Sequence, residues 1–136
     1  MRDIPIRATV GTEASNLGDV FTCGLFGEAL PHGDEKRTPA TRATLNKIIK
    51  DRIRFSEIFG ILGVDRRRWT KSQMVVYSLY RPDLFESDGF ATLFELEGGF
   101  VASVFLTVRN RFGVYYYPFL SGVRWYTERL RVVSLA

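Results

Sequence analysis

Apolar and polar residues alternate at the beginning of the chain, where every second position from residue 4 to residue 10 is isoleucine, alanine or valine. This period of two predicts a half-buried β-strand that ends at Gly11. Pro5 has no amide donor, which places the strand at the edge of a sheet. Residues 11–37 hold five glycines and only scattered apolar side chains. We therefore expect this segment to be an irregular, loop-rich arm.

The spacing of the apolar residues changes after residue 37. Four of them recur at the intervals of one helix face, with charged residues between them, and this predicts an amphipathic helix that begins at Thr38 or Thr41. The apolar surface continues over residues 55–62 and ends at Gly63. Residues 38–63 are thus predicted to be one kinked helix, or a helix followed by a second short one. The four positions are Leu45, Ile48, Ile49 and Ile53.

Strand patterns follow one another closely in the second half of the chain, which holds 15 of the 19 aromatic residues after residue 68. Short turns separate most of them, so neighbouring strands are expected to be antiparallel. This predicts an α+β fold, in which a mainly antiparallel β-meander of five to six strands packs against one or two helices. The expected strands are residues 72–80, 89–97, 100–109, 114–120 and 123–135, with turns at residues 98–99, 110–113 and 121–122.

A helix followed by a curved antiparallel sheet, at this chain length, is similar to the nuclear-transport-factor-2-like fold. That resemblance implies a pocket between the helix and the sheet. It is one of architecture, because no family motif of catalytic residues maps onto the chain, and the glycine-rich first third departs from the long opening helices of that fold.

The size and composition point to one domain spanning residues 1–136, because 136 residues with 46% hydrophobic content can bury a core without disulfide or metal support. The lone Cys23 cannot form an internal disulfide, which favours an intracellular location. A virion-associated location is the alternative that goes with the viral hypothesis stated below. No apolar run of signal-peptide length follows Arg2 and Asp3, and none approaches the length of a membrane span. We therefore expect neither a signal peptide nor a membrane-spanning segment.

A net charge of +4 and a pI near 9.5 raise the question of a nucleic-acid partner. Fifteen of the 19 basic residues are arginine, whose planar fork suits phosphates. Together with aromatic side chains, arginines form the surfaces that bind RNA or single-stranded nucleic acid. The alternatives are an interface with an acidic protein partner, a solvated strand face, or a run of arginines that stabilises a helix end. The candidate set is Arg66, Arg67, Arg68, Trp69, Arg109, Arg111, Arg124, Arg129 and Arg131.

Three consecutive tyrosines, Tyr115, Tyr116 and Tyr117, put aromatic surface on both faces of the predicted sheet. One face is core, and the other needs a cover, because large exposed apolar patches usually mark interaction sites. With Trp125, the tyrosines are therefore a candidate protein interface. The alternative is that residues 11–37 of the same chain cover them.

Catalytic patterns are weak in this sequence. His32 is the only histidine and lies in a polar turn, and no nucleophile-elbow pattern surrounds Ser103, Ser121 or Cys23. Metal sites built on several histidines or cysteines are excluded by count. Glu95 and Glu97, with Asp83, resemble the carboxylates of a metal-dependent nuclease, but no lysine follows them. We predict no cofactor, no metal and no enzymatic activity.

The sequence therefore predicts a small, basic, non-enzymatic interaction or assembly protein that forms a homo-oligomer or docks on a larger complex. Compactness, arginine bias and the expected arm favour a viral or phage structural or accessory component. The alternative is a nucleic-acid-binding module that uses the arginine and aromatic surface. The third hypothesis is a small pocket protein or enzyme with a helix-plus-curved-sheet fold.

Overall fold

A computed structural model describes residues 3–15, 20–26, 35–48, 52–86, 90–107, 109–126 and 130–136. It confirms the predicted α+β class. The first half holds β1 (Asp3–Ile6), β2 (Phe21–Phe26), β3 (Thr41–Lys47) and α2 (Phe55–Gly60). The second half holds α3 (Lys71–Tyr80), the 3-10 turn η1 (Pro82–Leu84), β4 (Ala91–Leu96), β5 (Phe100–Leu106), β6 (Phe112–Pro118) and β7 (Leu130–Leu135).

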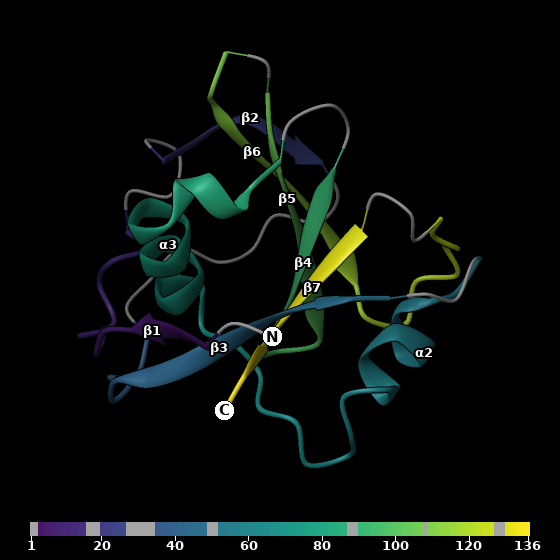
Figure 1. Ribbon diagram of the computed structural model, residues 1–136, viewed down its shortest axis with the longest axis horizontal. Helices are drawn as coiled ribbons and strands as arrows, with labels where there is room; N and C mark the ends of the chain where they lie inside the picture. The colour runs from purple at the N-terminus through teal and green to yellow at the C-terminus, as the bar shows by residue number, and fades with distance from the viewer. Residues whose placement is uncertain are drawn as a thin grey trace.

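The strands form one mixed, mostly antiparallel sheet in the order β1-β3-β7-β4-β5-β6-β2 (Figure 1). The predicted meander is confirmed for β4, β5 and β6, which pair antiparallel in sequence order. It is wrong for residues 123–135, because the chain does not turn back beside β6. Instead, β7 lies between β3 and β4, antiparallel to the first and parallel to the second. β2 adds a further parallel pairing, with β6.

Both faces of the sheet are buried. α3 covers one face, where Phe94, Leu96, Ala102 and Val104 belong to the larger core cluster. α2 covers the opposite face, where a second cluster forms around alternate residues of the same strands. Figure 1 shows the two helices on opposite sides of the central strands. The sequence pattern predicts solvent or a partner on this second face, but the chain itself covers much of it.

The helix predicted from Thr38 or Thr41 is wrong, because residues 41–47 form β3. Its neighbours β1 and β7 pair with it along both edges and satisfy its backbone groups. The apolar spacing was misleading because its members do not share one face. Leu45 packs against the cluster under α3, whereas Ile48 and Ile53 belong to the cluster under α2. Ile49 lies outside the described residues.

The strand predicted for residues 72–80 is also wrong, because this segment forms α3. Thr70 begins the helix with a capping box: its hydroxyl accepts from the Gln73 amide at 3.1 Å, and Gln73 Oε1 accepts from the Thr70 amide at 3.0 Å. The carboxylate of Glu35 accepts from the amides of Lys71 and Ser72 at 2.9 and 2.8 Å. A carboxylate at a helix N-terminus is stabilising, since the amides there have no partner within the helix.

The first third of the chain is more ordered than the predicted arm. β1 confirms the edge strand, although it ends at Ile6, and the side chains of Ile4 and Ile6 are buried in the core. β2 lies within residues 11–37, where we expected only an irregular segment. The second, short helix that was one of the two predictions for residues 38–63 is present as α2.

The sheet splits between β4 and β7, and the segment before α3 fills the gap. The two strands pair over residues 91–93 and 130–132. Beyond this point, Trp69 bridges to Leu96 and Arg67 bridges to Leu135. The Trp69 amide donates to the Glu95 carbonyl at 2.8 Å, and the Glu97 amide donates to the Trp69 carbonyl at 2.9 Å. We call residues 67–69 the wedge segment.

Replacing Trp69 by Phe should lower the free energy of unfolding by about 2–4 kcal/mol, through a lost buried hydrogen bond and a cavity. The reason is that Trp69 Nε1 donates to the Val133 carbonyl at 3.0 Å from a fully buried position. Urea denaturation followed by circular dichroism measures the loss.

The matched control is Trp125→Phe. Within the described chain, Trp125 Nε1 is buried and has no hydrogen-bond partner, so this change should cost less than about 1 kcal/mol. Equal losses in the two variants would show that the Trp69 hydrogen bond does not hold the wedge segment in place.

Candidate functional site

The three consecutive arginines belong to the extended stretch around the wedge segment, so neighbouring side chains point to opposite faces of the sheet. Arg66 and Arg68 turn towards Glu95, which is only 4% exposed. Arg66 Nε and Nη2 donate to the two Glu95 oxygens at 2.6 and 3.0 Å. The Arg68 Nε lies 3.4 Å from Glu95 Oε2. The arginine run is therefore divided between a buried ion pair and the surface.

Arg66 has a structural role in this arrangement. The hydrogen bond with Glu95 raises the pKa of the Arg66 guanidinium above its ordinary value, against the opposing effect of burial. The same guanidinium donates to the Gly63 carbonyl at 3.1 Å and lies 5.7 Å from the ring centroid of Phe119. These contacts leave Arg66 poorly placed to bind a partner.

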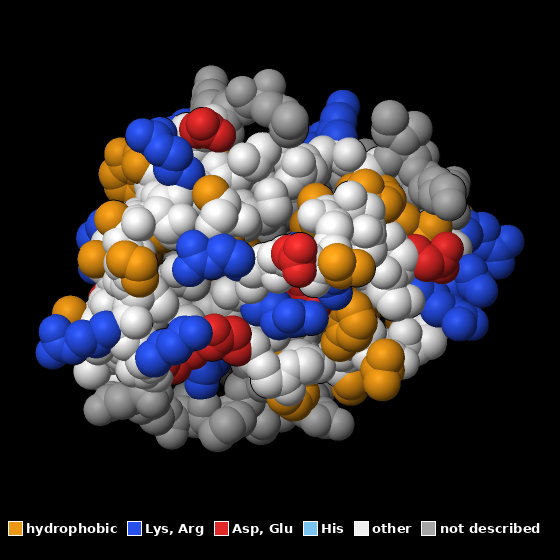
Figure 2. All heavy atoms as spheres, turned by 90° about the horizontal axis from the view of Figure 1, so that it is seen from below, with side chains coloured by type: hydrophobic (Ala, Val, Ile, Leu, Met, Phe, Trp, Pro, Cys, Tyr) orange, Lys and Arg blue, Asp and Glu red, His pale blue; other side chains and the backbone are white. Residues whose placement is uncertain are grey.

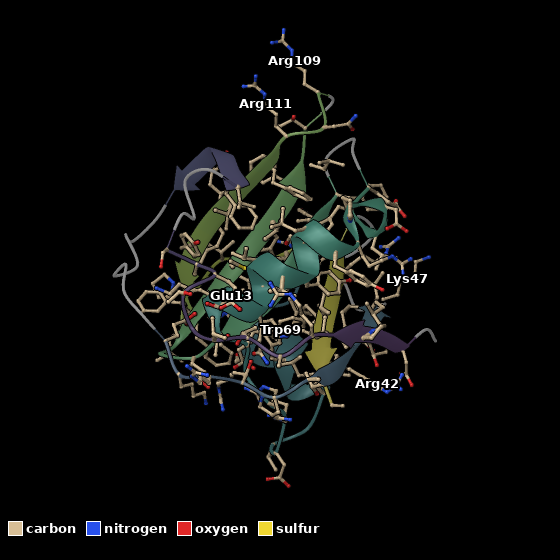
Figure 3. All side chains as sticks on the ribbon, turned by 90° about the vertical axis from the view of Figure 1, so that its left-hand side faces the viewer. Glu13, Arg42, Lys47, Trp69, Arg109 and Arg111 are labelled. Atoms are coloured by element: carbon tan, nitrogen blue, oxygen red, sulfur yellow. The ribbon has the colours of Figure 1, made fainter. Side chains whose placement is uncertain are left out.

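The other predicted arginines are scattered over the surface. Arg109 and Arg111 lie in the turn between β5 and β6 and point away from the body of the protein (Figure 3). Arg124 donates to the Arg52 carbonyl at 3.0 Å. Arg131 is half-buried, with its guanidinium 5.1 Å from the Phe90 ring centroid. The structure therefore does not bring the predicted basic set together, and Arg129 lies outside the described residues.

The aromatic members of the predicted sites are largely covered. Trp69 is 1% exposed, which leaves no ring face for a base. Tyr116 is buried in the cluster under α3, and its burial raises the pKa of its hydroxyl. Tyr117 packs on Phe55 and Trp125, with ring centroids 5.7 and 5.5 Å away.

Tyr115, the remaining tyrosine of the three, stacks on Phe105 with ring centroids 5.0 Å apart. We expected a partner or residues 11–37 to cover the outer tyrosines. Tyr117 is instead covered by α2 and by Trp125 of the same chain. The half-buried state of Tyr115, Tyr117 and Trp125 leaves only part of each side chain for an interface.

A basic hollow of about 270 Å³ forms where residues 36–39 meet the wedge segment and the start of α3. Figure 2 shows basic and acidic side chains gathered close together on the face seen there. Sequence reasoning identified Arg67 and Arg68 but missed Lys36 and Arg37, which come from a distant part of the chain. The lining is Lys36, Arg37, Thr38, Pro39, Arg67, Arg68, Thr70, Gln73 and Glu97.

An apolar groove of about 660 Å³ lies between the end of α3, β1 and the start of β3. Leu79 and Tyr80 are 58% and 60% exposed beside it. Nothing in the sequence indicates this groove, because the pattern of residues 72–80 predicts a strand. Its lining is Pro5, Ile6, Arg7, Ala40, Thr41, Arg42, Val76, Leu79 and Tyr80.

The carboxylates of the nuclease-like hypothesis are not brought together as a site. Glu95 is bound by Arg66 and Arg68, Glu97 pairs with Lys36, and Asp83 pairs with Arg81. Among the described residues, no group of three or more His, Cys, Asp and Glu side chains is placed to hold a metal ion. His32 and the side chain of Cys23 lie outside the described part.

Searches with the sequence and the structure found no matching family model, no matching curated protein and no matching solved structure. The resemblance to the nuclear-transport-factor-2-like fold loses its basis, because the opening helix on which it depends is strand β3. Within the described ranges, no helix has the length and apolar character needed to cross a bilayer.

Replacing Glu95 by Gln should lower the free energy of unfolding by about 2–4 kcal/mol, because it leaves the guanidinium of Arg66 without its counter-charge in a nearly buried site. Equilibrium denaturation at neutral pH measures this. Glu97→Gln is the matched control: its partner Lys36 is exposed, so the loss should stay below about 1 kcal/mol. Comparable losses would contradict the structural role of Glu95.

Proposed function

We propose that this protein is a non-enzymatic docking module, and that the apolar groove binds an apolar segment of a larger protein partner. The exposure of Leu79 and Tyr80 carries the proposal. Large exposed apolar side chains that gather beside a groove usually mark an interaction site. The groove volume of about 660 Å³ lies in the range of ligand-binding pockets in proteins.

The charges around the groove favour an acidic partner segment. Arg7 and Arg42 line the groove, and no acidic residue is found among the described residues of its lining. Arg42 is exposed, and Arg7 pairs with Glu13 at 3.2 Å but keeps most of its side chain in solvent. A bound segment would therefore gain from acidic residues beside its apolar anchors, through faster association and discrimination against basic partners.

A second copy of the chain fits this groove less well. Two copies would bring Arg7 and Arg42 of each groove towards one another, with a net charge of +4 on each chain. Pairing through the edge strand β1 is also hindered, because Pro5 offers no amide donor. Docking on a different protein is therefore favoured over the homo-oligomer.

Selection of peptides displayed on phage tests the proposal, with the purified protein as target and Leu79→Asp as the counter-selection target. We expect peptides that combine large apolar residues with acidic ones. The variant should bind the selected peptides at least about tenfold more weakly, since a charge would be buried against an apolar anchor. Isothermal titration calorimetry with synthetic peptides measures the difference.

The matched control is Leu120→Asp, which places the same charge at a leucine that is 87% exposed and lies outside the groove. This variant should bind the peptides as the wild type does. No enrichment of peptides, or peptides that bind Leu79→Asp equally well, would overturn the proposal. Self-association that Leu79→Asp abolishes would replace the acidic partner with a second copy of the chain.

A further inference from the structure

Two guanidinium groups of the basic hollow have no side-chain carboxylate partner among the described residues. Arg37 is exposed and makes no ion pair there. Arg67 donates to the backbone oxygen of Ala136 at 2.9 Å and is otherwise exposed. Lys36 pairs with Glu97, and Arg68 keeps 46% of its side chain exposed beside Glu95. The described part of the lining thus holds four cations and one carboxylate.

The backbone that carries these cations is held in place by the fold. Thr38 and Thr9 exchange two backbone hydrogen bonds of 2.9 and 3.1 Å. On the opposite side of the hollow, Arg67 bridges to Leu135 within the split sheet. Binding an anion between the two segments therefore requires ordering of side chains alone, which lowers the entropic cost of binding.

The composition of the hollow favours nucleic acid over an acidic protein. The centres of protein–protein interfaces are depleted in charged residues and rich in aromatic ones. Here the lining is charged or polar apart from Pro39. Interfaces with nucleic acid are more polar and more positively charged, and the planar fork of arginine matches two phosphate oxygens at once.

We infer that the basic hollow binds the phosphates of a nucleic-acid strand without reading its bases. Sequence independence follows because none of the described residues that line the hollow is aromatic and the neighbouring Trp69 is buried. The contacts are then those of charge with the backbone, which position a strand but carry no sequence information. This inference does not depend on the docking proposal, since the hollow and the apolar groove share no lining residue.

Fluorescence anisotropy with a labelled oligo(dT) of about 20 nucleotides tests the inference, from about 50 to 200 mM salt. The wild type should bind, and oligo(dA) of the same length should bind within about twofold. The variant Arg37→Ala/Arg67→Ala should lose about tenfold in affinity, and its slope of log affinity against log salt should fall by about 1.4, as expected for two lost contacts with a single strand.

Arg109→Ala/Arg111→Ala is the matched control, because it removes the same charge from an exposed turn far along the chain. It should bind within about twofold of the wild type. Equal losses in the two double variants would overturn the inference, since net charge alone would then explain binding. So would absence of binding at low salt, or stronger competition by poly-glutamate than by unlabelled oligo(dT).

The single variant Arg37→Ala guards against a loss of folding, because Arg37 lies on the surface outside the wedge segment. It should melt at the wild-type temperature. Its slope of log affinity against log salt should fall by about 0.7, which is half of the change expected for the double variant. An unchanged salt slope in this folded variant would remove Arg37 from the site and overturn the inference.

Discussion

The burial of Trp69 in the split between β4 and β7 organises the centre of the fold. Parallel neighbours that diverge leave unpaired backbone groups in the middle of a sheet, and such groups are costly when buried. The wedge segment satisfies them through its bridges to Leu96 and Leu135. The indole adds a hydrogen bond to the Val133 carbonyl and edge-to-face contacts with Tyr77 and Phe94. One residue thereby joins both strands to α3.

The same insertion explains why a run of three arginines does not form one binding surface. Once Trp69 faces the core under α3, the pleat turns Arg66 and Arg68 to the opposite face, where Glu95 receives them. Removing one partner of such a nearly buried pair is costly, because it leaves an uncompensated charge. The intact pair adds little net stability, since both charges had to leave water, and its main effect is to fix the position of the segment. Arg67 faces the other way and remains at the surface.

The sequence predicted the elements whose pattern is local. Turn residues and strict alternation located β4, β5 and β6, and the apolar stripe located α2. β3 was mistaken for a helix because Leu45 and Ile48 serve opposite faces of the sheet. α3 was mistaken for a strand because seven of its ten residues are buried, which weakens any one-sided stripe. The capping box at Thr70 was the one local signal for that helix. Of the four cations that line the basic hollow, the sequence predicted Arg67 and Arg68 as site residues. It missed Lys36 and Arg37, because they come from a distant part of the chain and join the other two through tertiary contact.

Coverage of both sheet faces restricts where this protein can bind anything. α3 and α2 with their aromatic neighbours fill the two faces, and the basic hollow and the apolar groove lie at opposite ends of α3. The basic hollow includes Thr70 and Gln73 at the start of that helix, and the apolar groove includes Leu79 and Tyr80 at its end. Residues 36–42 run past both, supplying cations to the first and Arg42 to the second. Because the Thr9–Thr38 bridge and β3 anchor this stretch, the two surfaces hold a fixed spacing, so a protein segment in the groove and a nucleic-acid strand in the hollow would lie at a fixed distance from one another.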